Sequence, residues 1–164
     1  MPRVHVVDES TAGAEEVLSA AHDFSPRRAE LWRDVYEEHL TVHDNSETWA
    51  EVTEGNPWPV VGLVWERLRY DWSQPGSVAG VVVESNIFKP GSTWEIRAVA
   101  KEGGGSRVEI IAFRNLKGRG WLLWPFFPLG LARRDVAAYL RRFLDRVEAE
   151  SLRGARARSQ TAHE

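Results

Sequence analysis

The apolar residues near the C-terminus recur with the period of an α-helix. Between Leu129 and Leu152 they are separated by steps of three and four residues, which places them on one face of a helix. This stripe consists of Ala132, Val136, Ala137, Leu140, Phe143, Leu144 and Val147. Pro128 cannot continue a preceding helix, and proline suits the first turn of a new one. Since a helix of this length spans about 30 Å, we expect a sheet of similar size to cover its apolar face.

Upstream of this helix the pattern changes to period two, which is typical of β-strands. A first strand is predicted at residues 4–8, and six further strands at 38–42, 48–53, 63–72, 78–85, 93–101 and 107–115. Between the first and second strands, Ser10 or Thr11 and then Ser25-Pro26 can begin two short helices. Residues 55–59 contain two prolines, so we expect a loop there. The three valines at 81–83 predict a central strand that is partly covered on both faces.

In the last two predicted strands, charged residues alternate with apolar ones, which indicates how the strands face. Because neighbours along a strand point to opposite faces, we expect Trp94 and Ile110 to face the core. Arg114 lies in phase with Ile110, so its guanidinium would enter an apolar interior. Burial of a cation is costly without a carboxylate or another polar partner. The alternative is that Arg114 reaches solvent at the end of the strand.

The overall composition is that of one globular domain with its own core. The chain has 164 residues, of which 43% are hydrophobic and 27% charged. Its net charge of -3 creates no field that would attract nucleic acid, so we expect no nucleic-acid partner. The absence of cysteine excludes disulfides, thiol catalysis and thiolate metal sites. No signal-peptide pattern and no apolar run of about 20 residues occurs, so we expect a cytoplasmic protein without stable membrane insertion.

Three short stretches accompany this order of elements: residues 65–71 (WERLRYD), 88–92 (FKPGS) and 128–130 (PLG). Together with the order they resemble the START-related superfamily, often called SRPBCC, and within it the polyketide cyclase/dehydrase-like group. The resemblance implies an α+β helix-grip fold, in which a seven-stranded antiparallel sheet curves around the long C-terminal helix. It also implies an apolar ligand cavity between sheet and helix. Residues 1–150 would form this single domain, and 151–164 would form a mobile C-terminal tail.

Aromatic residues supply most of the candidate ligand contacts. The chain has eight tryptophans, whose flat rings stack on ligands as well as fill cores. The orientation of the 63–72 strand stays open. One of its faces carries Trp65 with two arginines, and the other carries Glu66 with Tyr70. The candidate ligand-binding residues are Trp65, Tyr70, Trp94, Arg114, Trp121, Trp124, Phe127 and Tyr139.

Residues 121–129 (WLLWPFFPL) form a run of nine residues without a charge. The resemblance implies that this run borders the mouth of the cavity. Such a run does not remain in water without a reason. It could pack on the sheet, act as a gate over the cavity, form the contact of a homodimer, or touch a membrane to collect lipid.

Most catalytic and metal-binding patterns are absent. His39 and His43 would lie about 13 Å apart on a strand, too far for one ion, so we expect no metal site. No serine has the setting of a nucleophile elbow, and the glycine-rich stretches 103–105 and 118–120 are predicted to be turns. We also expect no cofactor.

The pattern favours binding or transport of a hydrophobic small molecule that is lipid-like or polyketide-like. One alternative is a polyketide cyclase or dehydratase, in which Tyr70, Glu66 or an arginine would move protons or polarise a carbonyl. The other is a protein-interaction module with a filled core. The resemblance alone does not choose among these three functions.

Overall fold

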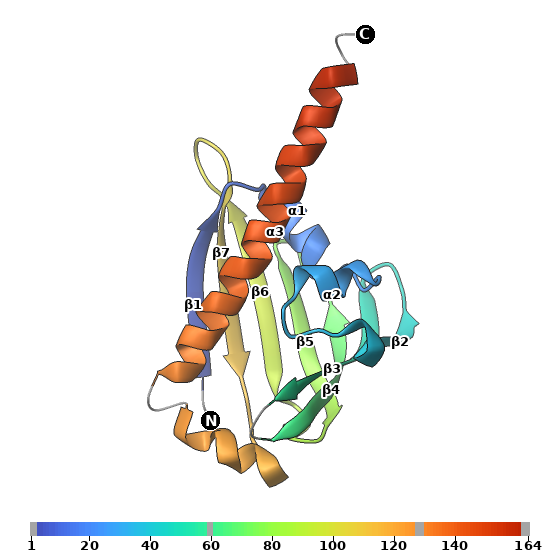
Figure 1. Ribbon diagram of the computed structural model, residues 1–164, viewed down its shortest axis with the longest axis vertical. Coiled ribbons are helices and arrows are strands. Elements are labelled where there is room, and N and C mark those ends of the chain that lie inside the picture. The colour runs from blue at the N-terminus through green and yellow to red at the C-terminus, as the bar shows by residue number, and fades with distance from the viewer. Residues whose placement is uncertain (1–2, 59–60, 127–129, 162–164) are drawn as a thin grey trace.

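The computed structural model describes residues 3–58, 61–126 and 130–161. Seven strands in this part of the chain form one antiparallel sheet: β1 (Arg3–Ser10), β2 (Thr41–Asn45), β3 (Trp49–Trp58), β4 (Gly62–Asp71), β5 (Ser77–Ser85), β6 (Thr93–Ala100) and β7 (Ser106–Phe113). Their spatial order is β1-β7-β6-β5-β4-β3-β2, so only β1 pairs with a strand distant in sequence. The long helix α3 (Leu131–Thr161) crosses one face of the sheet (Figure 1). This arrangement is the predicted α+β helix-grip fold.

Two short helices, α1 (Ala14–Ala21) and α2 (Arg27–Leu31), connect β1 to β2, as the sequence predicted. Two short 3-10 helices also occur, η1 (Glu37–His39) before β2 and η2 (Gly118–Phe126) before α3. The backbone N–H of Gly13 donates a hydrogen bond to the Glu16 carboxylate at 2.9 Å, which satisfies one free donor at the start of α1. Helices α1 and α2 lie beside α3 on the same face of the sheet (Figure 1).

The core lies between the sheet and α3. Alternate residues of β6 and β7 are buried, including Trp94 and Ile110, so the predicted orientation of these two strands is confirmed. From α3, the buried residues are Leu140, Phe143, Leu144 and Val147. Burial of one such side chain contributes roughly 1.5–3 kcal/mol. The apolar stripe therefore fixes the helix on the sheet.

The predicted loop at residues 55–59 was wrong in its first part, because β3 continues through Trp58 and pairs with the start of β4. β2 pairs with β3 only as far as Thr53, so β3 has no neighbour on that side at Pro57. Proline is tolerated there because its missing N–H faces no partner strand. The unpaired edge thus explains how the strand accommodates Pro57.

Two further predictions need correction. β5 is the central strand, as predicted, but Val81 and Val83 are each 44% exposed, so the outer face of the sheet is open there. Helix α3 was predicted to end at Leu152 and in fact continues to Thr161, past the end of the sheet (Figure 1). The segment predicted to be a mobile tail is therefore helical up to Thr161, and its mobility stays a prediction.

Candidate functional site

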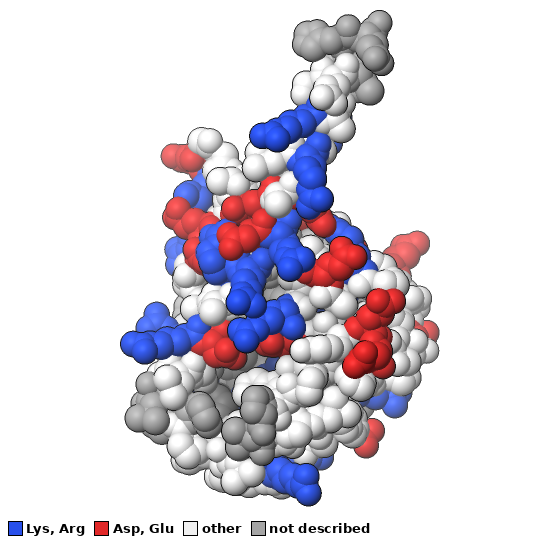
Figure 2. Space-filling model, viewed as in Figure 1, with Lys and Arg blue, Asp and Glu red and all other residues white. Residues whose placement is uncertain are grey.

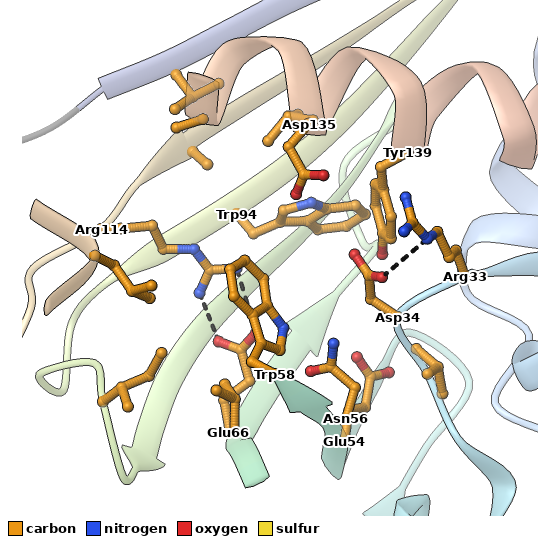
Figure 3. A pocket seen from close by; sticks show the side chains of 18 of the residues that line it. Arg33, Asp34, Glu54, Asn56, Trp58, Glu66, Trp94, Arg114, Asp135 and Tyr139 are labelled. Atoms are coloured by element: carbon orange, nitrogen blue, oxygen red, sulfur yellow. Dashed lines mark hydrogen bonds and ion pairs between the residues drawn. The ribbon is translucent and has the colours of Figure 1, made fainter. Parts of the chain in front are cut away.

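A cavity of about 770 Å³ opens between the sheet and α3. Its wall is mainly apolar, with Val64, Trp94, Ile110 and Ala112 on the sheet and Val136 on α3. Figure 3 shows Trp94 and Tyr139 beneath α3 and several charged side chains around them. Small-molecule sites are commonly apolar cavities of roughly 300–1,000 Å³ with a few polar groups. The size and the lining of this cavity match that description.

Three of the predicted site residues, Trp94, Arg114 and Tyr139, line this cavity. An aromatic cluster below the cavity holds two of them. The ring of Trp32 lies 4.8 Å from the ring of Tyr139 and 5.8 Å, edge to face, from the ring of Trp94, between centroids. Trp32 itself stacks on Phe143 of α3 at 3.9 Å. The cluster connects α3 to the sheet and fixes the orientation of two aromatic walls.

The other predicted site residues lie elsewhere. Tyr70 is buried beneath the cavity and does not line it. Trp65 points to the opposite face of the sheet, because Val64 and Glu66 on either side of it line the cavity. Phe127 lies outside the described residues.

The η2 helix places its apolar residues on two sides. Leu123 is buried and lines the cavity, whereas Trp121 and Trp124 are exposed and do not. The segment therefore borders the cavity, and the gate, dimer and membrane roles stay predictions.

Arg114 forms an ion pair in the wall of the cavity. Its Nη1 lies 2.5 Å from Oε2 of Glu66, and its guanidinium lies over the ring of Phe88 at 4.7 Å. Figure 3 shows the two side chains pointing toward each other. Burial raises the pKa of the Glu66 carboxyl, and Arg114 opposes part of that rise. Arg114 thus faces inward and has a carboxylate partner.

Another ion pair, between Arg28 and Glu54, belongs to a buried polar network. Arg28 is 1% exposed, and its Nε donates to Oε1 of Glu54, which lines the cavity. Its other nitrogens donate to the backbone oxygen of Ala21 at 2.8 Å and to Oη of Tyr70 at 3.2 Å. The Tyr70 hydroxyl in turn donates to Oε2 of Glu54 at 3.0 Å. The network therefore satisfies a fully buried cation.

Burial, followed by the negative charge of Glu54, raises the pKa of Tyr70 well above its ordinary value. Burial and the same carboxylate also raise the pKa of Tyr139. Both hydroxyls consequently keep their protons at neutral pH and can donate hydrogen bonds. Tyr139 is the one that lines the cavity.

The sequence interpretation missed Arg28 and Glu54. Arg28 lies one helical turn before the buried Trp32, and Glu54 shares a strand face with the buried Ala50 and Val52. A charge in phase with apolar residues was therefore the available signal. It was used for Arg114 but not for these two residues.

Acidic side chains lie at the rim of the cavity. Asp34 and Asp135 both line it, and Figure 3 shows them near Tyr139. Burial and then the neighbouring Asp135 raise the pKa of Asp34. No group of three histidine, aspartate or glutamate side chains that could hold a metal ion occurs within residues 3–58, 61–126 and 130–161. Over the same residues, no helix is long and apolar enough to cross a membrane.

No family model matches the sequence, and no curated protein matches it. Solved structures do. The protein TTHA0849 from Thermus thermophilus aligns over 92% of this chain and 99% of its own, with 18% identity and a TM-score of 0.74. The ZhuI aromatase/cyclase from Streptomyces sp. R1128 aligns over 89% and 93%, with 15% identity and a TM-score of 0.71.

A START superfamily protein from Mycobacterium smegmatis aligns over 90% of this chain and 97% of its own, with 11% identity and a TM-score of 0.68. Identities this low support a statement about fold alone. Element order, strand topology and these three alignments agree. The chain therefore has a helix-grip fold, similar to the folds of the START superfamily protein and the aromatase/cyclase.

Proposed function

We propose that this chain binds a hydrophobic small molecule, lipid-like or polyketide-like, in the cavity between the sheet and α3, and carries it unchanged. The single observation that supports the proposal is the cavity itself, about 770 Å³ with a mainly apolar wall. An interaction module with a filled core would have no need of such a volume. The apolar body of the ligand would lie against Trp94, Ile110 and Val136.

The polar end of the ligand would face the Arg114–Glu66 pair. Because this cation already has a carboxylate partner, a neutral oxygen such as a carbonyl or hydroxyl is a better match than an anion. The hydroxyl of Tyr139 provides a second donor in the same cavity. The ligand class would therefore be an apolar molecule with one or two uncharged oxygen atoms.

Native mass spectrometry of gently purified protein, with extraction of any bound compound, tests the proposal. A matched pair of variants makes the test specific. Ala112 is buried in the cavity wall, so Ala112→Leu fills part of the cavity, whereas Ala79→Leu makes the same substitution on the outer face of the sheet. We expect Ala112→Leu to lower the affinity for an apolar fluorescent ligand by at least about tenfold. Equal affinity in a folded Ala112→Leu protein would exclude binding in this cavity.

A second candidate function, cyclisation or dehydration of a polyketide-like substrate, is favoured by one observation. Glu66 combines a raised pKa with an adjacent arginine inside the cavity. In such a reaction Glu66 would remove a proton from a carbon next to a carbonyl, while Arg114 stabilised the developing enolate oxygen. The enolate carbon would attack a second carbonyl, and the proton would return from Glu66 to the new alkoxide.

Turnover separates the two functions. The enzyme would convert a poly-β-ketone mimic to a cyclic product, and Glu66→Gln would abolish conversion while leaving binding largely intact. A carrier would bind the mimic and release it unchanged. The released compound can be identified by mass spectrometry in both cases.

A further inference from the structure

The η2 helix exposes a compact aromatic and aliphatic surface, which we call the η2 patch. It consists of Trp121, Leu122 and Trp124, which are 57%, 55% and 45% exposed. The two indole rings lie 5.7 Å apart. Single exposed apolar side chains are normal on a protein surface, but several that form one patch indicate an interaction site.

The exposure of the η2 patch is imposed by close packing beneath it. Leu123, between the exposed residues, is buried in a cluster with Ile87 and Leu116. A Cβ added at Gly120 would lie 2.5 Å from the backbone oxygen of Ile87, so the helix approaches the neighbouring chain as closely as glycine allows. The patch residues cannot turn inward without displacing this cluster.

The stretch of the chain that contains the η2 patch is basic. Residues 110–134 contain five arginine and lysine side chains and no carboxylate. Arg114 is paired with Glu66, and the other four, Lys117, Arg119, Arg133 and Arg134, make no ion pair with any residue in the described ranges. Figure 2 shows that this end of the molecule is largely free of acidic side chains, in contrast to the mixed charges over α3. This stretch of the chain is thus positively charged, although the whole chain carries -3.

We propose that the η2 patch docks on the surface of an anionic lipid bilayer. Tryptophan favours the boundary between headgroups and acyl chains, because its ring is apolar and its N–H remains hydrogen-bonded. Neighbouring lysine and arginine side chains add attraction to anionic headgroups. Since Leu123 connects the patch to the cavity, docking would bring the cavity wall next to the lipid. The inference goes beyond the proposed function, because docking requires no ligand in the cavity.

A second copy of the chain fits the η2 patch less well. In a two-fold symmetric dimer the same surface of each copy meets the other. The four basic side chains would then approach their own symmetry mates, and like charges placed together oppose association. Anionic lipid instead supplies the complementary charge.

Co-sedimentation with vesicles tests the proposal. We expect the wild-type chain to pellet with vesicles of phosphatidylcholine and phosphatidylglycerol at low salt, less at high salt, and little with phosphatidylcholine alone. Trp121→Ala/Trp124→Ala should lower the affinity by at least about tenfold. Replacing Lys117, Arg119, Arg133 and Arg134 together by glutamine should remove most of the salt dependence.

Two controls match these variants. Val81→Ala/Val83→Ala removes exposed apolar groups from the outer sheet face, and Arg153→Gln/Arg156→Gln removes basic charge from the far end of α3. Both should bind vesicles as the wild-type chain does. The proposal is overturned if the folded tryptophan variant retains full affinity for vesicles or if the wild-type chain binds no vesicles. It is also overturned if the Arg153/Arg156 variant, rather than the tryptophan variant, loses vesicle affinity.

Two further measurements separate this proposal from others. The wild-type chain could instead be a dimer that binds no vesicles, with the tryptophan variant a monomer. That result would assign the η2 patch to a dimer contact. The cavity-filling Ala112→Leu variant should still bind vesicles. Vesicle binding by a chain that binds no apolar ligand in the cavity would still support docking, so the two proposals can fail separately.

Discussion

Nη1 of Arg114 lies 2.5 Å from Oε2 of Glu66, although two strands, β6 and β5, separate β7 from β4 in the sheet. The arginine follows the end of β7 and reaches across the inner face of the sheet over the ring of Phe88. The pair therefore places a neutralised ionic bridge in a mainly apolar cavity wall. Both partners are mostly buried, so solvent screens their attraction only weakly.

The first prediction concerns this pair. Arg114→Met leaves the Glu66 carboxylate buried without its cation, so we expect the free energy of unfolding to fall by about 1–3 kcal/mol. Glu66→Leu should cost a similar amount because it leaves Arg114 unpaired. The double variant should recover much of the loss, since neither charge then remains. Urea denaturation of the four proteins measures the coupling, and additive costs would show that the two side chains act independently.

A second prediction concerns the hydroxyl of Tyr70. Tyr70→Phe removes a donor to Glu54 and an acceptor from Arg28, so we expect a loss of about 1–2 kcal/mol at neutral pH. Because the pKa of Tyr70 is raised in the folded state, the unfolded chain loses this proton first as the pH rises. The advantage of the wild type should thus shrink above pH about 10, the ordinary tyrosine pKa.

Tyr36→Phe is the matched control, because Tyr36 is 41% exposed and its hydroxyl should contribute little to stability. Thermal unfolding at several pH values compares the two variants. A pH-independent difference between the wild type and Tyr70→Phe would show that the ionisation of Tyr70 does not affect stability.

The third prediction tests the turn between β6 and β7. Gly105 has a φ of +75°, and a Cβ there would lie 2.3 Å from the backbone oxygen of Ser10. Gly103 has a similar φ of +86° with open space around it. Both Gly→Ala substitutions carry the cost of positive φ, about 1 kcal/mol. Because Gly105→Ala must also displace β1, we expect it to lower the melting temperature clearly more than Gly103→Ala does. Equal effects of the two substitutions would exclude a role for the Ser10 contact.

The sequence predicted the parts of the fold that repeat with a regular period. The stripe on α3 and the alternation in β6 and β7 were visible because many residues obey one period. The continuation of β3 through Pro57 was not, since it depends on how far β2 extends alongside. Edge positions are a property of the assembled sheet and leave no local pattern.

The site was predicted less completely for a related reason. One face of β4 carries Trp65 and the other carries Glu66. Judged by the hydrophobicity of these two residues, the face with the tryptophan is the one expected to be buried. The structure instead turns Glu66 to the inner face, where Arg114, 48 residues further along the chain, pairs with it. A long-range ion pair cannot be read from either strand alone. The same applies to Glu54, whose partner Arg28 lies on a helix.

The last prediction concerns the attachment of α3 to β1. Oε1 of Glu148 accepts hydrogen bonds from Oγ of Ser10 at 2.8 Å, from the N–H of Thr11 at 3.2 Å and from Nη2 of Arg141 at 2.8 Å. Burial alone would raise the pKa of Glu148, but the bonds from Arg141, Ser10 and Thr11 outweigh it and lower the pKa. The ionised carboxylate is therefore favoured in the folded state.

Glu148→Gln should accordingly lower the free energy of unfolding by about 1–3 kcal/mol at neutral pH, because the replacement cannot supply a charged acceptor. A lowered folded-state pKa gives stability that is present above the unfolded pKa, about 4.3, and is lost as the pH falls through the folded value. The difference between the variant and the wild type should shrink in that acidic range. Glu102→Gln, at an exposed turn, is the control and should show no such dependence. A cost for Glu148→Gln that persists undiminished in acid would mean that Glu148 stabilises the helix by packing rather than by charge.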